Sequence, residues 1–149
     1  MQGYKKISIF DLIIMALTVF GEASICADYE QVKVAWVILN RAEKMKWNIA
    51  RVCFTPWHFS CWRQNKYLWR FVIEVVFGEG KEWSYEWKEF ARCLNNCIIA
   101  IMERDEGRQW GGLYYHDKSI PKPDDWDFAE LIEETRYFKF YKQKEVKKG

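Results

Sequence analysis

The segment ISIFDLIIMALTVFGEA, residues 7–23, constrains the fold of this chain more than any other. Its periodicity predicts a helix with apolar residues on almost the whole circumference, and such a helix is buried. The helix is predicted to start at Ser8, with Asp11 three residues on as an imperfect capping box. We therefore expect a central helix inside one domain, residues 1–149, which is long enough to bury a real core.

One polar stripe interrupts this apolar helix. Residues at spacings of four, three and four share one narrow face: Asp11, Met15, Thr18 and Glu22. A buried helix with a single polar face is typical of the wall of a cleft, and Glu22 ends that face. Because an unpaired carboxyl is costly to bury, Glu22 either points to water or serves a chemistry that benefits from dry surroundings.

The rest of the hydrophobic pattern predicts an α+β domain that is mainly α. It indicates about four helices and a small antiparallel β element near the C-terminus. After the first helix we expect a second that begins at Asp28, with Gln31 as its capping partner, and a third over residues 67–77. A fourth is expected to run from near Ser84 to Gly107, a glycine typical of the position after a helix C-terminus. The expected strands lie within 111–117 and 136–142, and residues 48–62 and 120–128 are expected to be loops.

Composition excludes several classes of function. Nine Trp, eight Tyr and ten Phe suit a sugar-binding cleft as well as a core. A net charge of +2 is too small to predict a nucleic-acid partner.

The apolar stretch 12–20 is too short to span a bilayer, so no stable membrane insertion is expected. Asp11 interrupts what would be a signal peptide, which predicts folding in a cytoplasm.

The cysteines and histidines predict no metal site. Five cysteines, at positions 26, 53, 61, 93 and 97, are an odd number without a disulfide spacing, which favours reduced and buried thiols. His58 and Cys61 are two candidate ligands, but nothing nearby completes a zinc pattern. No metal and no organic cofactor is therefore expected. A thiol enzyme that uses Cys61 with His58 or His116 is one rival interpretation.

Four motifs in register resemble one known family. They are FGEA (20–23) followed by EQVKVAWVILNR (30–41), FSCW (59–62), GGLYYHD (111–117) and FKFYK (138–142). In this order they are similar to segments of the SleB-type cell-wall hydrolases, the family of spore-cortex-lytic enzymes, and the resemblance covers almost the whole chain. It implies a lysozyme-like fold. The chain departs from the family pattern where Ser24, Cys26 and Phe138 replace an arginine, a second glutamate and a histidine.

The resemblance implies a peptidoglycan-degrading enzyme with Glu22 as its catalytic residue. Lysozyme-like lytic transglycosylases, to which the family is similar, use one glutamate as acid and then as base. They cut the β-1,4 bond between N-acetylmuramic acid and N-acetylglucosamine and leave 1,6-anhydro ends. The residues agree, since an acid that stays protonated near neutral pH needs apolar neighbours.

A water-using muramidase or glucosaminidase is the first alternative, and it would need a second carboxylate. The nearest candidates, Asp28, Glu30 and Asp117, lie among polar residues, which favours transglycosylation. A non-catalytic peptidoglycan-binding protein is the alternative from another class, because of the departures at 24, 26 and 138.

Further residues are expected to contact the glycan strands by their place in the motifs or on the polar stripe: Thr18, Phe59, Ser60, Trp62, Tyr115 and His116. Tyr115 and His116 alternate along a strand, so we expect only one of them to face the cleft. Asn40 and Arg41 are expected to make structural hydrogen bonds or salt bridges.

The origin of the protein is also an expectation. The missing export signal favours a phage or prophage lysis protein, an endolysin made in the host cytoplasm that acts on the cell wall. A holin or a virion component is the candidate partner for its delivery.

Overall fold

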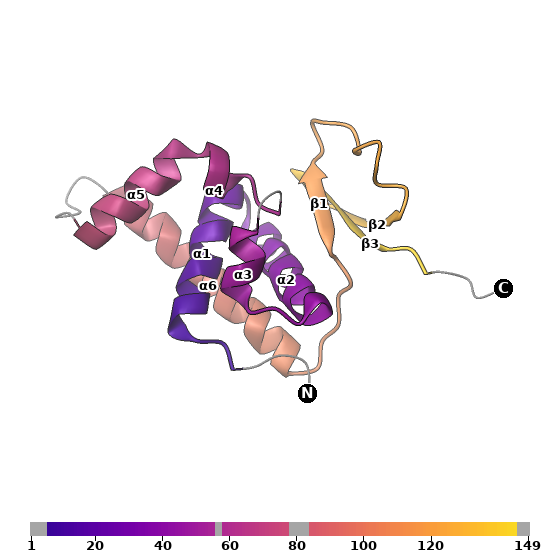
Figure 1. The fold of residues 1–149 in the computed structure, drawn as a ribbon, viewed down its shortest axis with the longest axis horizontal. Helices are drawn as coiled ribbons and strands as arrows, with labels where there is room; N and C mark the ends of the chain where they lie inside the picture. Colours follow the sequence, from indigo (N-terminus) through magenta and orange to yellow (C-terminus); the bar gives the residue numbers. More distant parts are fainter. Residues whose placement is uncertain (1–5, 56–57, 78–83, 146–149) are drawn as a thin grey trace.

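The computed structural model describes residues 6–55, 58–77 and 84–145 of the chain. Its elements, in chain order, are α1 (Ile9–Ala23), α2 (Asp28–Met45), α3 (Ile49–Phe54), α4 (Cys61–Gln64), α5 (Lys66–Phe77), α6 (Ser84–Asp105), β1 (Tyr114–Asp117), β2 (Ala129–Glu134) and β3 (Phe138–Gln143). The helices form one part of the molecule and the small sheet lies beside them (Figure 1). The expected class, α+β and mainly helical, is confirmed.

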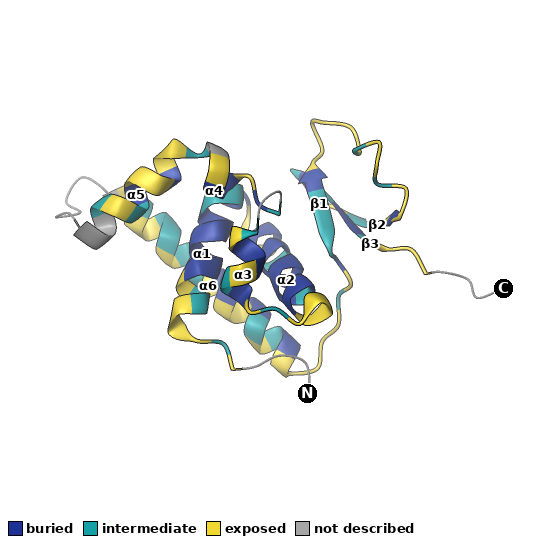
Figure 2. Cartoon of the chain, viewed as in Figure 1, coloured by how far each residue is buried: buried dark blue, intermediate teal, exposed yellow. Residues whose placement is uncertain are grey.

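Helix α1 begins where the sequence predicts, and its later turns are buried. The Ser8 hydroxyl accepts a hydrogen bond from the backbone N–H of Asp11 at 3.0 Å, which caps the helix. Every residue from Ile14 to Phe20 is buried. The first turn differs from the expectation, because Ile9 is 78% exposed and Phe10 is 61% exposed. The helices that cover the later turns leave this first turn open (Figure 2).

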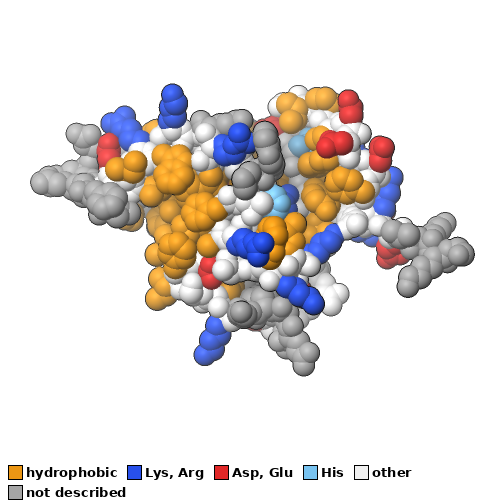
Figure 3. Space-filling model, viewed as in Figure 1, with side chains coloured by type: hydrophobic (Ala, Val, Ile, Leu, Met, Phe, Trp, Pro, Cys, Tyr) orange, Lys and Arg blue, Asp and Glu red, His pale blue; other side chains and the backbone are white. Residues whose placement is uncertain are grey.

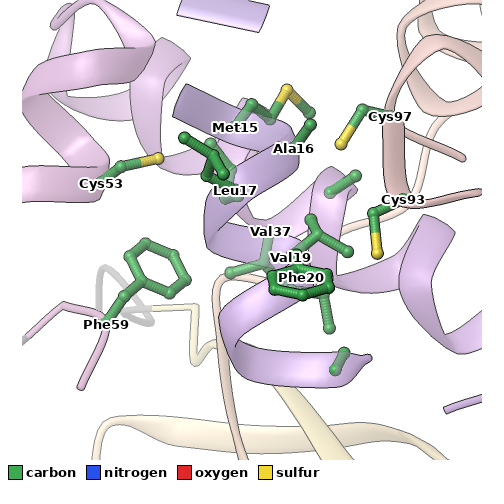
Figure 4. Close-up of a cluster of buried hydrophobic side chains, with 14 of the residues drawn as sticks. Met15, Ala16, Leu17, Val19, Phe20, Val37, Cys53, Phe59, Cys93 and Cys97 are labelled. Atoms are coloured by element: carbon green, nitrogen blue, oxygen red, sulfur yellow. The ribbon is translucent and has the colours of Figure 1, made fainter. Parts of the chain in front are cut away.

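The core lies where α1, α2 and α6 pack together. Small side chains on α6 allow the close approach, since Cys93, Cys97 and Ala100 are fully buried. Figure 4 shows Cys93 and Cys97 beside the side chains of α1, with Cys53 on another side of that helix. All five cysteines are buried and carry free thiols, as the sequence indicates.

The start of α2 corrects one capping prediction. The carboxylate of Glu30, not Gln31, accepts the backbone N–H of Ala27, at 3.4 Å. Ala27 is the residue before the helix, so the third helical position is Glu30. Gln31 is instead fully buried and donates from its side-chain amide to the carbonyl of Ala23, at the end of α1.

Residues 48–62 are not the simple loop that their composition indicates. They contain α3 and the first two residues of α4. Asn48 caps α3 by accepting the backbone N–H of Arg51 at 2.7 Å. The Asp11 carboxylate accepts the backbone N–H of Ala50 at 3.1 Å, so this segment is tied to α1. Such short helices are stabilised by tertiary contacts, which local propensity does not show.

The sheet has the antiparallel strand order β1-β3-β2. The two predicted strands are confirmed as β1 and β3, and Gly107 ends α6 with the expected positive φ, +93°. The structure adds β2, which the sequence pattern missed. This edge strand is acidic, and an irregularity in its register between Leu131 and Glu133 breaks the alternation that a strand normally shows.

Glu30 joins the helical part to the sheet. It is fully buried, and its Oε2 accepts hydrogen bonds from the Thr135 hydroxyl at 2.5 Å and from the backbone N–H of Tyr137 at 2.9 Å. These donors lie in the turn between β2 and β3. One carboxylate at the start of α2 therefore fixes the sheet, which includes the strand that contacts Glu22.

Candidate active site

Glu22 lies half-buried in the last turn of α1, where the helices meet the sheet. Its Oε1 accepts a hydrogen bond from the Tyr115 hydroxyl of β1 at 2.8 Å, across 93 residues of sequence. The backbone N–H and the thiol of Cys61 in α4 also face this carboxyl, and the charge of Arg41 in α2 is near. Three helices and one strand therefore meet around a single acid.

Burial raises the pKa of Glu22 above its ordinary value. Hydrogen bonds from the Tyr115 hydroxyl and the Cys61 backbone, together with the charge of Arg41, partly oppose this rise. The balance favours the protonated acid, and the same donors stabilise the carboxylate once the proton has left. This combination suits a group that must act as an acid and then as a base.

Gly21 permits the close approach of α4 and α5 to this acid. A Cβ at Gly21 would lie 2.7 Å from Cys61 Cβ and 2.8 Å from Leu68 Cδ2, which is too close for either contact. The residue next to Glu22 is therefore a glycine because two helices press against it there.

Replacing Gly21 by alanine is expected to lower the free energy of unfolding by about 1–3 kcal/mol, the usual cost of an overpacked core. Gly111→Ala is the matched control, since its new Cβ would meet only Lys142 Cβ at the ordinary distance of 3.8 Å. Urea unfolding of both variants measures the difference. Equal stability of the two variants would show that the contact at Gly21 relaxes freely.

The polar stripe of α1 is not the open cleft wall that its pattern predicts, because Met15 and Thr18 are fully buried. The Thr18 hydroxyl donates to the carbonyl of Ile14 at 2.8 Å and accepts the indole N–H of Trp62 at 2.9 Å. Thr18 therefore holds Trp62 from inside the protein instead of meeting solvent. Trp62 itself is only 8% exposed and packs edge-on against Phe54 and Trp69.

The other FSCW residues lie close to the acid in different ways. Phe59 is 2% exposed and lies between the guanidinium of Arg41, 4.9 Å from its ring centre, and the ring of Tyr115, at 6.4 Å. Ser60 is exposed at the start of α4. Phe59 thus supports Tyr115 from behind, and Ser60 is the member of this motif that solvent reaches.

Tyr115 and His116 point to opposite faces of the sheet, as alternation requires. Tyr115 faces Glu22 and packs against Phe138 and Phe140. His116 is buried on the other face, where Nε2 lies 2.7 Å from the Tyr141 hydroxyl. The expectation that one of the two faces the site is met by Tyr115, and His116 supports the sheet.

Asn40 and Arg41 make structural hydrogen bonds, as expected. The Asn40 amide donates to the carbonyls of Trp110 and Gly112, both at 2.8 Å, and Arg41 Nε donates to the carbonyl of Leu113 at 2.7 Å. They fix the segment that leads into β1. Arg41 also acts on Glu22 by its charge, a role that the sequence reasoning missed because nothing local relates the two residues.

The candidate second carboxylates all have structural partners. Asp28 accepts hydrogen bonds from Arg92 at 2.8 Å and Asn96 at 3.1 Å, and the Arg92 bond lowers the pKa of Asp28. Asp117 accepts the backbone N–H of Ser119 at 2.8 Å, which lowers its pKa as well. Glu30 is enclosed by its three donors. None of these three carboxylates is arranged as an acid beside Glu22.

The thiols do not provide a nucleophile or a substitute carboxylate. Burial raises the pKa of Cys61 well above its ordinary value, so this thiol stays protonated at neutral pH. Burial likewise raises the pKa of Cys26 to about 12. In residues 6–55, 58–77 and 84–145, no three His, Cys, Asp or Glu side chains group as metal ligands.

The fold is that of a lysozyme-like α+β domain, and Glu22 lies half-buried where its helices meet its sheet. A solved structure with this fold is the catalytic domain of the Bacillus cereus SleB protein. The match has a TM-score of 0.66 and covers 93% of this chain and 94% of that one, at 20% sequence identity. The expected SleB-type fold is thus confirmed. No protein-family model and no curated protein sequence matches the chain.

Proposed function

We propose that this protein degrades peptidoglycan as a lytic transglycosylase, with Glu22 as general acid and base. The observation that carries the proposal is the half-buried Glu22 carboxyl, whose pKa is raised by burial while Tyr115 and Cys61 donate to it. A SleB-like fold supports the choice of peptidoglycan, because the similar structure is the catalytic domain of that protein.

The reaction needs only one carboxyl. Protonated Glu22 donates its proton to the glycosidic oxygen, and the bond from that oxygen to C1 of N-acetylmuramic acid breaks. The resulting carboxylate, stabilised by the Tyr115 hydroxyl, takes the proton of the C6 hydroxyl of the same sugar. That oxygen then bonds to C1 and gives the 1,6-anhydro ring, while Glu22 regains its proton. No water is consumed.

Mass spectrometry of soluble fragments from purified peptidoglycan tests this function. Anhydro-N-acetylmuramic ends are expected. Fragments heavier by one water, with reducible ends, would replace the proposal by the muramidase or glucosaminidase alternative. Binding to peptidoglycan without any release, by a folded protein, would favour the non-catalytic alternative. The phage or prophage origin, with delivery through a holin or virion component, stays a prediction.

Tyr115→Phe is expected to move the pH dependence of cleavage to higher pH. The hydrogen bond from Tyr115 lowers the pKa of Glu22 and so opposes the rise that burial causes. Without this hydrogen bond the pKa of Glu22 rises further. The protonated acid then persists to higher pH, and the falling limb of the rate shifts in that direction. Tyr114→Phe is the control, because Tyr114 packs against Trp126 and Phe128. A shift to lower pH would contradict the assigned role.

A further inference from the structure

The end of the molecule made by α4, α5 and the start of α6 has an unusual surface, which we call the α5 face. Among the described side chains of residues 61–74 and 85–92, every exposed one is basic, aromatic or aliphatic. The large apolar members are 40–69% exposed: Tyr67, Trp69, Ile73, Tyr85 and Trp87. Figure 3 shows hydrophobic side chains gathered where α4 and α5 lie, with lysine and arginine side chains next to them.

The outward charge of the α5 face is positive. Its exposed charged residues are Arg63, Lys66, Arg70 and Lys88. The acids in the same segments are half-buried and hydrogen-bonded: Glu74 to Arg70, Glu86 to the Tyr67 hydroxyl, and Glu89 to Arg92. In the described part of this face Lys66 and Lys88 are exposed cations, whereas each of the three carboxylates is hydrogen-bonded to a neighbouring side chain.

The apolar residues of the α5 face are held in place by the fold. Leu68 and Phe71 bury the inner side of α5. The indole N–H of Trp69 donates to the carbonyl of Trp62 at 2.6 Å, which fixes its ring at the surface. Lys66, Trp69 and Ile73 are among the residues around an open hollow of about 350 Å³. The exposed rings thus form a defined surface.

We infer that the α5 face binds the surface of a bilayer that contains anionic lipids. Trp and Tyr rings flanked by Lys and Arg favour the headgroup level, and basic residues there are attracted to anionic lipids. In the described part of the chain no helix is long and apolar enough to cross a membrane.

Sedimentation with lipid vesicles tests this inference without any peptidoglycan. The native protein is expected to bind vesicles of equimolar phosphatidylcholine and phosphatidylglycerol, and phosphatidylcholine alone only weakly. Replacing Lys66 and Lys88 by glutamine is expected to lower the partition coefficient about thirty-fold, since each lysine near the surface contributes about fivefold. Raising the salt concentration should weaken binding in the same way.

The matched control is Lys44→Gln with Lys144→Gln, which removes the same charge at exposed positions outside the α5 face. The control should bind like the native protein, and circular dichroism should show both variants folded. Equal losses in the two variants would overturn the inference, because net charge alone would then explain binding. A second outcome would also overturn the inference. In it the native protein binds no vesicles but binds peptidoglycan or a second copy of the chain, and the Lys66→Gln, Lys88→Gln variant loses that binding.

Discussion

Glu22→Gln is expected to lower the rate of peptidoglycan cleavage by about a hundred- to ten-thousand-fold, the usual contribution of a general acid. Glutamine keeps the size of the side chain and accepts the hydrogen bond of Tyr115, but it has no proton to give. Release of soluble dye-labelled fragments from peptidoglycan measures the rate.

The loss should not come from unfolding. Burial raises the pKa of Glu22 in the folded protein, so ionising this carboxyl at neutral pH destabilises the fold. That penalty is absent at a pH below the pKa of Glu22 in the unfolded chain, and it grows as the pH rises above that value. The glutamine side chain of the variant is neutral at every pH, so the variant does not carry the penalty. Glu22→Gln should therefore be at least as stable as the native protein at neutral pH. Glu106→Gln, at an exposed position, is the control, and an equal loss of rate in both variants would remove Glu22 from the mechanism.

Glu30→Ala is expected to lower the free energy of unfolding by about 3–5 kcal/mol. The change removes the acceptor of the Tyr137 backbone N–H and leaves the buried Thr135 hydroxyl with only the Phe138 carbonyl at 3.4 Å. Each buried donor left unsatisfied costs about 1–3 kcal/mol. The N–H of Ala27, which lies at the surface, turns to water instead. Since the same carboxylate fixes the sheet to α2, the bond between Tyr115 and Glu22 should weaken as well.

Urea unfolding measures this effect against Glu130→Ala, an exposed glutamate of β2 that lies 3.8 Å from Lys142. An exposed ion pair of this kind contributes about 0–1 kcal/mol, so the control should change little. If Glu30→Ala lost no more stability than the control, the buried carboxylate would not be what holds the sheet in place.

The sequence predicts the elements whose signals are local. Ser8 caps α1, Gly107 ends α6, and the alternation of β3 is visible in its residues. Glu22 stands out in the sequence for a local reason as well, because it is an isolated acid at the end of an apolar helix. Alternation also indicates that either Tyr115 or His116 faces the site.

Contacts between distant segments are what the sequence could not show. Which face of β1 meets Glu22 depends on how the whole sheet docks, and Glu30 fixes that docking from another helix. Thr18 looked like a cleft residue because its partner, Trp62, lies 44 residues away in a segment expected to be a loop. Helical periodicity shows a polar face, and only the packing shows what covers it.

The pKa of Glu22 in the native protein is the most direct test of the central claim, that burial holds one acid ready for glycosidic cleavage. Carbon-detected NMR of the side-chain carboxyl, followed through a pH titration, gives its midpoint. We predict a midpoint above the ordinary glutamate value of about 4.3, since burial outweighs the hydrogen bonds of Tyr115 and Cys61. A midpoint at or below that value would contradict the proposed acid.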